Sequence, residues 1–211
     1  ERVAGGKYED RLYYGLLACE FDYDRMSLLI IGDNFLITSD IEMGGVNLKV
    51  VRDDLYPFVG GGSKARKAVA YEAFLREEGY NAIVTCGGIQ SNHNRAMALM
   101  CARNGWKCHL CIQGDEERFL SEKGNALLDR LSGAECELIK PEYTAAAMDR
   151  AMEKLKAEGY NPFYVIGGGH NLPGGTCFVD AVRELKLRCD QVGYKPDYLF
   201  LASGTGSTQA G

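Results

Sequence analysis

The chain has 211 residues, of which 46% are hydrophobic and 25% charged, and its formal net charge is −5. At roughly 150 residues per domain, this length allows one large α/β unit or two lobes. The composition excludes intrinsic disorder and coiled coil. The acidic balance argues against a nucleic-acid or membrane partner, because such binders rely on basic patches. A small anionic ligand remains compatible with it.

Cysteine usage and the start of the chain indicate the compartment. The eight cysteines are too dispersed in a chain of this length to form a secreted disulfide scaffold. The first twenty residues are acidic and contain no basic region leading into an apolar run, so we expect no signal peptide. The longest charge-free stretch, 159–179, is too rich in glycine and proline to span a membrane. We therefore expect a cytoplasmic protein.

The pattern of elements changes near residue 46. The first 45 residues are acidic and rich in tyrosine, and we interpret them as a peripheral arm. From there on, short apolar runs alternate with amphipathic stretches. The expected strands are 47–51, 82–86, 108–112, 135–139, 162–166 and 198–202. The expected helices lie near 64–78, 93–104, 121–132, 144–158 and 174–189. This alternation predicts an α/β fold with parallel strands joined by helical crossovers.

Glycine-rich segments follow several of these strands or precede a helix. They lie at 60–64, 87–92, 167–171 and 203–208. Because open parallel sheets bind ligands at the carboxyl ends of their strands, we expect the chemistry there.

Lys64 follows three glycines and a serine at the start of a predicted helix. The helix dipole disfavours a cation at that end and so favours the free amine, which is a nucleophile. Such a lysine could form a Schiff base with a carbonyl cofactor. The alternative is that Lys64, Arg66 and Lys67 form a solvated basic cluster.

The segment Ser203–Thr208 has two glycines and several hydroxyls after a predicted strand. Successive backbone N–H groups in such a turn can converge on a phosphate, although a plain turn is equally compatible. It fails as a dinucleotide fingerprint because Gln209 stands where the third glycine would, and no Walker A pattern occurs.

Two further motifs have structural alternatives. In Gln90-Ser91-Asn92-His93, Ser91 or Asn92 could simply cap the following helix. The motif is not that of a serine hydrolase, and no acid is evident to orient His93. Cys108-His109-Leu110-Cys111 lies in a predicted strand, where residues three apart point to opposite faces. The two thiols therefore cannot bind one ion, and we expect buried structural cysteines and no metal site.

Three segments together carry a family resemblance. They are Asp53-Asp54-Leu55 leading to 61–67 (GGSKARK), 87–95 (GGIQSNHNR) and 202–211 (ASGTGSTQAG). In this order they resemble the D-cysteine desulfhydrase and 1-aminocyclopropane-1-carboxylate deaminase family, pyridoxal-phosphate enzymes of the tryptophan-synthase-β fold type. The resemblance runs from about residue 46 to the end of the sequence.

The resemblance implies a role for each motif. Lys64 would carry the cofactor, Asn92 would bond the pyridine 3′-oxygen, and Ser91 would meet the substrate carboxylate and assist proton transfer. The implied catalytic residues are Lys64 and Ser91. The implied cofactor-binding residues are Lys64, Asn92, Ser203, Gly204, Thr205, Gly206, Ser207 and Thr208. The implied substrate-binding residues are Ser91, Asn92 and His93.

The implied activity is that of a pyridoxal-phosphate-dependent lyase or deaminase. A small amino acid resembling D-cysteine would become a 2-oxo acid and ammonia through an aldimine on Lys64. His93 resembles the desulfhydrases, because the deaminases tend to have glutamine there. The alternatives are 1-aminocyclopropane-1-carboxylate deaminase, a fold relative that binds cofactor or a partner without turnover, and a generic nucleotide binder.

The resemblance also implies a fold of two open, mainly parallel sheets with helices on both faces, and a homodimer. The expected domains are an arm and start of the large domain over 1–60, a small α/β domain over 61–172, and a return to the large domain over 173–211. Two departures are expected to matter. Ser63 replaces a common asparagine, and the C-terminal part that supplies the partner of the pyridine nitrogen is missing, so we expect a fragment.

Overall fold

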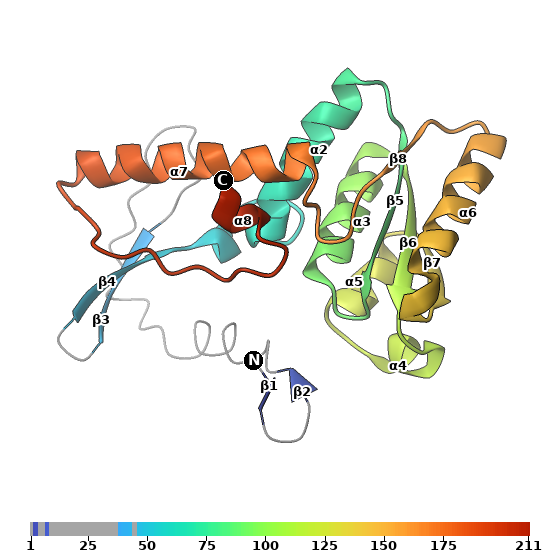
Figure 1. Ribbon diagram of the computed structural model, residues 1–211, viewed down its shortest axis with the longest axis horizontal. Helices are drawn as coiled ribbons and strands as arrows, with labels where there is room; N and C mark the ends of the chain where they lie inside the picture. Colours follow the sequence, from blue (N-terminus) through green and yellow to red (C-terminus); the bar gives the residue numbers. More distant parts are fainter. Residues whose placement is uncertain (1, 4–6, 9–37, 44–45) are drawn as a thin grey trace. The chain divides into compact units, whose positions relative to one another are not determined.

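A computed structural model describes residues 2–3, 7–8, 38–43 and 46–211 (Figure 1). The described residues up to Val51 belong to one compact unit, and Arg52–Gly211 belong to another. The domain boundaries expected at residues 60 and 172 stay predictions, and most of the expected peripheral arm lies outside the described residues. No helix in the described part is both long and apolar enough to cross a membrane.

The first unit contains two antiparallel ladders. β1 (Arg2–Val3) pairs with β2 (Lys7–Tyr8), and β3 (Thr38–Met43) pairs with β4 (Val46–Val51). The strand expected at 47–51 is therefore confirmed as β4. The expectation that it is parallel is wrong, because two residues between β3 and β4 are far too few for a crossover connection.

The second unit is built on a four-stranded parallel sheet with the order β7-β6-β5-β8. Its strands are β5 (Ala82–Gly88), β6 (Lys107–Gln113), β7 (Glu135–Ile139) and β8 (Pro162–Tyr164). All three ladders are parallel, so the predicted α/β class with helical crossovers is confirmed. The carboxyl ends of the four strands consequently share one edge of the sheet.

Helices cover both faces of this sheet (Figure 1). The helices on one side are α2 (Ser63–Glu77), α3 (Asn92–Asn104) and α5 (Asn125–Leu131). They enclose a core with Ile83, Leu110 and Ile112. On the other side, α6 (Thr144–Ala157) packs against Val84 and Cys111. The strand residues alternate between the two cores because successive side chains of a strand point to opposite faces.

One expected helix begins later than predicted. Of the helix expected at 121–132, α5 covers 125–131, and a separate short helix, α4 (Glu116–Ser121), ends before Glu122. Glu122 is extended and Gly124 has a φ of +67°, so neither residue continues a right-handed helix. Two short 3₁₀ helices, η2 (Asp53–Leu55) and η3 (Pro141–Tyr143), precede α2 and α6.

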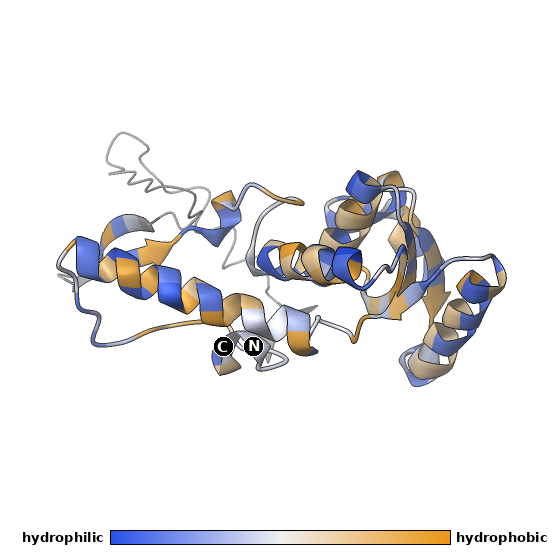
Figure 2. Cartoon of the chain, turned by 90° about the horizontal axis from the view of Figure 1, so that it is seen from above, coloured by the Kyte–Doolittle hydropathy of each residue, from blue (hydrophilic) through white to orange (hydrophobic). Residues whose placement is uncertain are grey.

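The C-terminal segment lies against α2. α7 (Leu172–Gln191) packs on α2, and the short α8 (Ser207–Ala210) packs on α7. Polar and apolar residues are interspersed along α7 (Figure 2). The strand expected at 198–202 is wrong: this stretch is irregular, and Tyr198 and Phe200 are 81% and 85% exposed. A strand needs a neighbour for its backbone hydrogen bonds, and no described strand lies beside it.

Candidate functional site

The start of α2 is fixed by the glycine loop before it. The Gly62 N–H donates to the Asp53 carbonyl at 2.6 Å, and the Gly61 N–H donates to the Phe58 carbonyl at 2.8 Å. Gly61 has a φ of +71°, and a Cβ there would lie 2.4 Å from the Asp54 carbonyl oxygen. Only glycine fits this position. The loop therefore sets Lys64 in the first turn of α2.

Two arginines hold this loop and helix in place. Arg66 donates to Asp53 at 2.8 Å and is only 7% exposed. Arg95, on α3, donates to the carbonyls of Gly60 and Gly61 at 2.7 and 3.0 Å. Because Arg95 joins α3 to the glycine loop, it holds the segment around Ser91 in a fixed position relative to the start of α2. The alternative of a solvated basic cluster is wrong, since Arg66 and Lys67 are buried.

Lys67 is the most buried cation of the site, with no exposed surface. Its Nζ donates to Ser207 Oγ at 2.5 Å and to the Gly168 carbonyl at 2.8 Å. Burial and then the charge of Lys64 lower the pKa of Lys67 to about 8, and burial also lowers the pKa of Lys64. No carboxylate of the described residues forms an ion pair with either lysine. Two adjacent lysines without a carboxylate partner among the described residues favour the binding of an anion.

The hydrogen bond between Lys67 and Ser207 holds the turn 203–208 against Lys67. Thr205 Oγ1 lies 3.2 Å from Ser207 Oγ, so both hydroxyls belong to one small polar group. Gly206 adopts a left-handed conformation just before α8. Ser203 is exposed, and its Oγ donates instead to Gln209 at 3.0 Å. The structure thus joins Ser207 to Lys67, and Thr205 to Ser207, while the Ser203 side chain points to Gln209.

Ser91 lies where the carboxyl end of β5 meets α3. Its Oγ accepts a hydrogen bond from the Asn94 N–H at 3.1 Å, so the capping interpretation is confirmed. A Cβ on Gly87 would lie 2.6 Å from Ser91 Oγ and 2.8 Å from Asn94 Oδ1, which makes glycine necessary for this close approach. Asn94 is fully buried, and its side-chain amide has no hydrogen-bond partner among the described residues.

Asn92 is oriented by a neighbouring helix. Its Oδ1 accepts a hydrogen bond from Asn125 Nδ2 at 2.9 Å, and Asn125 also donates its N–H to Gln90 Oε1 at 2.9 Å. The Gln90 amide in turn donates to the Lys123 carbonyl at 2.7 Å. The start of α5 therefore fixes the polar segment that follows β5.

His93 lies below this surface and is 3% exposed. Thr85 Oγ1 donates to the Val165 carbonyl and lies 2.9 Å from His93 Nε2, so Nε2 carries the proton and donates to Thr85. His93 Nδ1 is then a bare acceptor, without a partner in the described structure. Burial, followed by the charges of Lys64 and Lys67, lowers the pKa of His93 to about 3. Direct contact of His93 with a substrate stays a prediction.

Two residues of the site were missed by reasoning from the sequence. Lys67 stands three residues after Lys64, a spacing that places both side chains on one face of a helix, and this signal could have found it. Asn94 lies inside a quoted motif, but burial of its amide could not be read from the chain.

The comparisons with known proteins agree with this arrangement. A family model described as "Pyridoxal-phosphate dependent enzyme" matches residues 36–211. The chain is 33% identical to a 1-aminocyclopropane-1-carboxylate deaminase of Burkholderia lata over 80% of its length. It is 31% identical to a D-cysteine desulfhydrase of Klebsiella pneumoniae over 79%. It is also 35% identical to a bifunctional enzyme with both names from Arabidopsis thaliana over 79%.

These matches cover only part of the relatives. The chain spans 52% of the Burkholderia and Klebsiella proteins and 44% of the Arabidopsis protein. Among solved structures, an ACC deaminase homologue is 29% identical, with a TM-score of 0.63 over 78% of this chain and 49% of that one. O-ureido-L-serine synthase, 16% identical with a TM-score of 0.62 over 82% of this chain and 53% of that one, shows the shared fold alone.

Proposed function

Because the chain belongs to the family of pyridoxal-phosphate dependent enzymes, we propose that it converts a small amino acid resembling D-cysteine into a 2-oxo acid and ammonia. The observation that carries this proposal is the pair of lysines beside the turn 203–208. Lys64 is a half-buried amine, and Lys67 is a buried cation that contacts Ser207 and has no carboxylate partner among the described residues.

The residues present fit pyridoxal phosphate. Lys64 would hold the aldehyde carbon of the cofactor, and Lys67 with Ser207 and the turn 204–208 would hold its phosphate. The phosphate would then be the anionic partner of the Lys67 ammonium, which has none among the described residues. Asn92 would contact the 3′-oxygen through its amide Nδ2, because its Oδ1 is occupied by Asn125. When bound, the cofactor withdraws electrons from the α-carbon of an amino acid.

Lys64 and Ser91 would handle the substrate. The lowered pKa of Lys64 increases the fraction of free amine near neutral pH, which suits a group that first acts as a nucleophile and then moves a proton. Ser91 Oγ accepts the Asn94 N–H, so its own hydroxyl proton remains available to donate to a substrate carboxylate.

The relatives support two substrates for one site. Proteins at 33% and 31% identity carry the names of a 1-aminocyclopropane-1-carboxylate deaminase and a D-cysteine desulfhydrase, and a third relative carries both. We favour D-cysteine because of His93, and 1-aminocyclopropane-1-carboxylate is the alternative. Because the chain spans about half of these relatives, binding of the cofactor without turnover is the second alternative.

The first experiment tests the covalent step. Purified protein is titrated with pyridoxal phosphate, and the lysine-bound cofactor is followed by its near-visible absorbance and by borohydride reduction with mass spectrometry. We expect one reduced adduct, at Lys64, which is absent in Lys64→Ala. The control Lys156→Ala removes an exposed lysine of α6 and should behave like the wild type. An adduct that persists in Lys64→Ala would overturn the proposal.

The second experiment tests turnover. D-cysteine, L-cysteine and 1-aminocyclopropane-1-carboxylate are supplied in turn, and the 2-oxo acid, ammonia and sulfide are measured. Equal amounts of 2-oxo acid, ammonia and sulfide from D-cysteine would support the favoured substrate. A 2-oxo acid and ammonia from the cyclopropane alone would support the alternative. An adduct at Lys64 without any product would show that the chain binds the cofactor and does not turn over.

We further propose that the protein acts in the cytoplasm as a homodimer. The dispersed cysteines support the compartment, and exposed apolar side chains such as Leu172 and Tyr198 support an association that covers them. Light scattering on the eluted protein measures the number of copies, and a monomer at all concentrations would exclude the dimer.

A further inference from the structure

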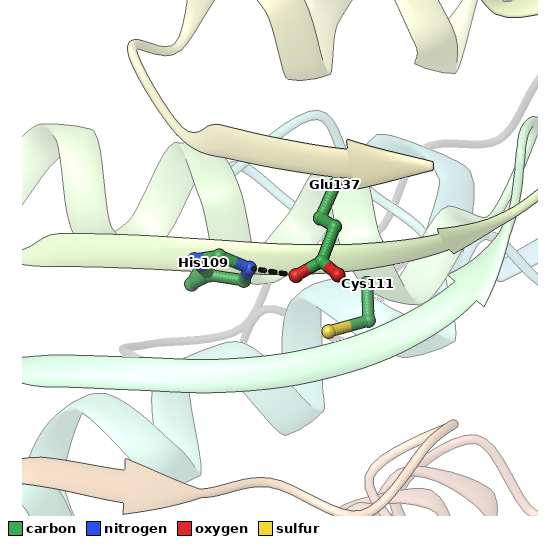
Figure 3. Close-up of side chains that lie close together, drawn as sticks. All are labelled: His109, Cys111 and Glu137. Carbon is green, nitrogen blue, oxygen red and sulfur yellow. Dashed lines mark hydrogen bonds and ion pairs between the residues drawn. The ribbon is translucent and has the colours of Figure 1, made fainter. Parts of the chain in front are cut away.

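Three possible metal ligands meet on the face of the sheet that packs against α6. His109 and Cys111 are two residues apart on β6 and therefore point to the same face. Glu137, on β7, is the register partner of Cys111. Figure 3 shows the three side chains converging from the two strands. The expectation that Cys108 and Cys111 point to opposite faces is confirmed. It excluded a metal site that uses both thiols, but it did not consider a site formed by Cys111 with Glu137.

The distances between the ligand atoms suit a small cation. His109 Nε2 lies 3.2 Å from Glu137 Oε2, and one ligand atom of each of the three residues lies within 4.8 Å of the others. With zinc–ligand bonds of about 2.0–2.3 Å, tetrahedral ligand atoms lie roughly 3.3–3.8 Å apart. A modest contraction would therefore complete the site. The imidazole, thiolate and carboxylate groups are the ligands that Zn²⁺ prefers.

Charged side chains lie beside two of the ligands. Arg150 donates to Glu137 Oε1 at 2.9 Å, which leaves Oε2 facing His109. On the other side of the imidazole, Glu135 Oε2 lies 3.7 Å from His109 Nδ1, a buried atom without a hydrogen bond in the described structure. A carboxylate behind a ligating histidine is the usual outer-shell arrangement of zinc sites.

We propose that His109, Cys111 and Glu137 bind one Zn²⁺ ion, with the fourth position open to water. His109 and Cys111 are buried, whereas Glu137 is partly exposed and gives the ion a path from solvent. The site is separate from the two lysines on α2, since it faces α6, whereas Lys67 contacts the turn 203–208. It therefore does not depend on the proposed amino-acid chemistry.

The test measures zinc affinity and the ligands directly. The full chain is treated with a chelator and dialysed, and Zn²⁺ is titrated in competition with a chromophoric chelator. Co²⁺ is then added to the metal-free protein as a spectroscopic probe, and the spectrum of the metal-free protein is subtracted. We expect one tightly held Zn²⁺ per chain and the intense visible bands of tetrahedral Co²⁺ with a thiolate ligand. No metal retained per chain, or Co²⁺ bands typical of six oxygen ligands, would overturn the proposal.

Matched variants locate the ion. Loss of an outer-shell partner typically costs about 10- to 100-fold in metal affinity, so Cys111→Ser and Glu137→Gln should each cost at least about 100-fold. Cys136→Ser changes the neighbour of Glu137 and should leave zinc affinity within about twofold, because metal affinity follows the ligands and their outer-shell partners. Glu135→Gln should lower affinity by about 10-fold through His109. Circular dichroism checks that each variant folds. If Cys111→Ser does not fold, Glu137→Gln, at a partly exposed position, still tests the site.

The outcome is decided by the pattern across the variants. Loss of affinity in Cys111→Ser and Glu137→Gln, with affinity kept in Cys136→Ser, supports the site. Unchanged affinity in both ligand variants would place the metal at other residues and overturn the proposal.

Discussion

Lys64 and Lys67 show how position decides what one residue type does. Both are on the same face of α2, yet Lys64 is half-buried, whereas Lys67 is fully enclosed and bonded to Ser207 and Gly168. Burial lowers both pKa values. Lys64 remains accessible to a ligand and therefore suits covalent chemistry. The ammonium of Lys67 is fixed beside Ser207 and therefore suits the binding of an anion. We infer that the first lysine reacts and the second binds the phosphate.

The variant Lys67→Met separates these two roles. Hydrogen bonds to charged groups contribute about 1.5–3 kcal/mol, so cofactor affinity should fall about 10- to 100-fold while the link to Lys64 still forms at saturation. Equilibrium titration followed by borohydride reduction measures both quantities. Equal affinity for wild type and Lys67→Met would contradict the assignment of the phosphate to this lysine.

The same variant has a pH signature without cofactor. The pKa of Lys67 is about 8 when folded and near its ordinary 10.5 when unfolded, so the unfolded chain binds more protons between these values. Stability of the wild type should therefore rise with pH across that window relative to Lys67→Met. Denaturant unfolding at several pH values measures the difference, and parallel curves would contradict the lowered pKa.

At the scale of elements, helix starts do two jobs in this fold. Ser91 caps α3 by accepting the Asn94 N–H, and Asp115 caps α4 by accepting the Arg118 N–H at 2.8 Å. Only the first cap lies at the carboxyl end of β5, in the arrangement that Arg95 joins to the glycine loop. Capping and a role in the site are therefore compatible for Ser91.

Ser91→Ala and Asp115→Ala form a matched pair. Each removes a side-chain cap and should cost about 1 kcal/mol of stability. Only Ser91→Ala should also lower turnover or raise the KM for the amino acid, with cofactor affinity kept. Denaturant unfolding and steady-state kinetics measure the two effects. If both variants lose stability and neither changes the kinetics, Ser91 is a cap alone.

At the scale of the whole molecule, the apolar residues of the sheet are covered, whereas those of one C-terminal stretch are exposed. The sheet of β5 and β6 is covered by helices on both faces, whereas the apolar residues 198–201 are exposed and unpaired with any described strand. Exposed apolar residues in an extended stretch are prone to pair with another chain or segment.

Hydrogen exchange should reveal this difference. Amides of β5 and β6 should be the slowest to exchange, because they open only with the whole sheet, and those of 198–201 should exchange fastest. Mass spectrometry of peptides at several protein concentrations measures the rates. Slow exchange at 198–201 that persists on dilution would contradict the unpaired state.

The strands at 82–86 and 108–112 were predictable because each is a short, mostly apolar run, and the strand at 135–139 because it begins with alternating polar and apolar residues; both patterns are local information. The start of the helix near 121–132 was harder to predict, because the extended Glu122 and the left-handed Gly124 keep the first residues of that range out of α5. The strand at 198–202 could not be decided locally at all, since the same apolar run forms a strand only beside a partner.

The sequence by itself determined the α/β class, the family resemblance and the candidate Lys64, because these depend on periodicity and on residues adjacent in the chain. Only the tertiary structure decided that Lys67 meets Ser207, 140 residues away, and that Glu137 meets His109 and Cys111. The physical reason is that burial and through-space charge depend on which segments the sheet brings together, and no local pattern contains that information.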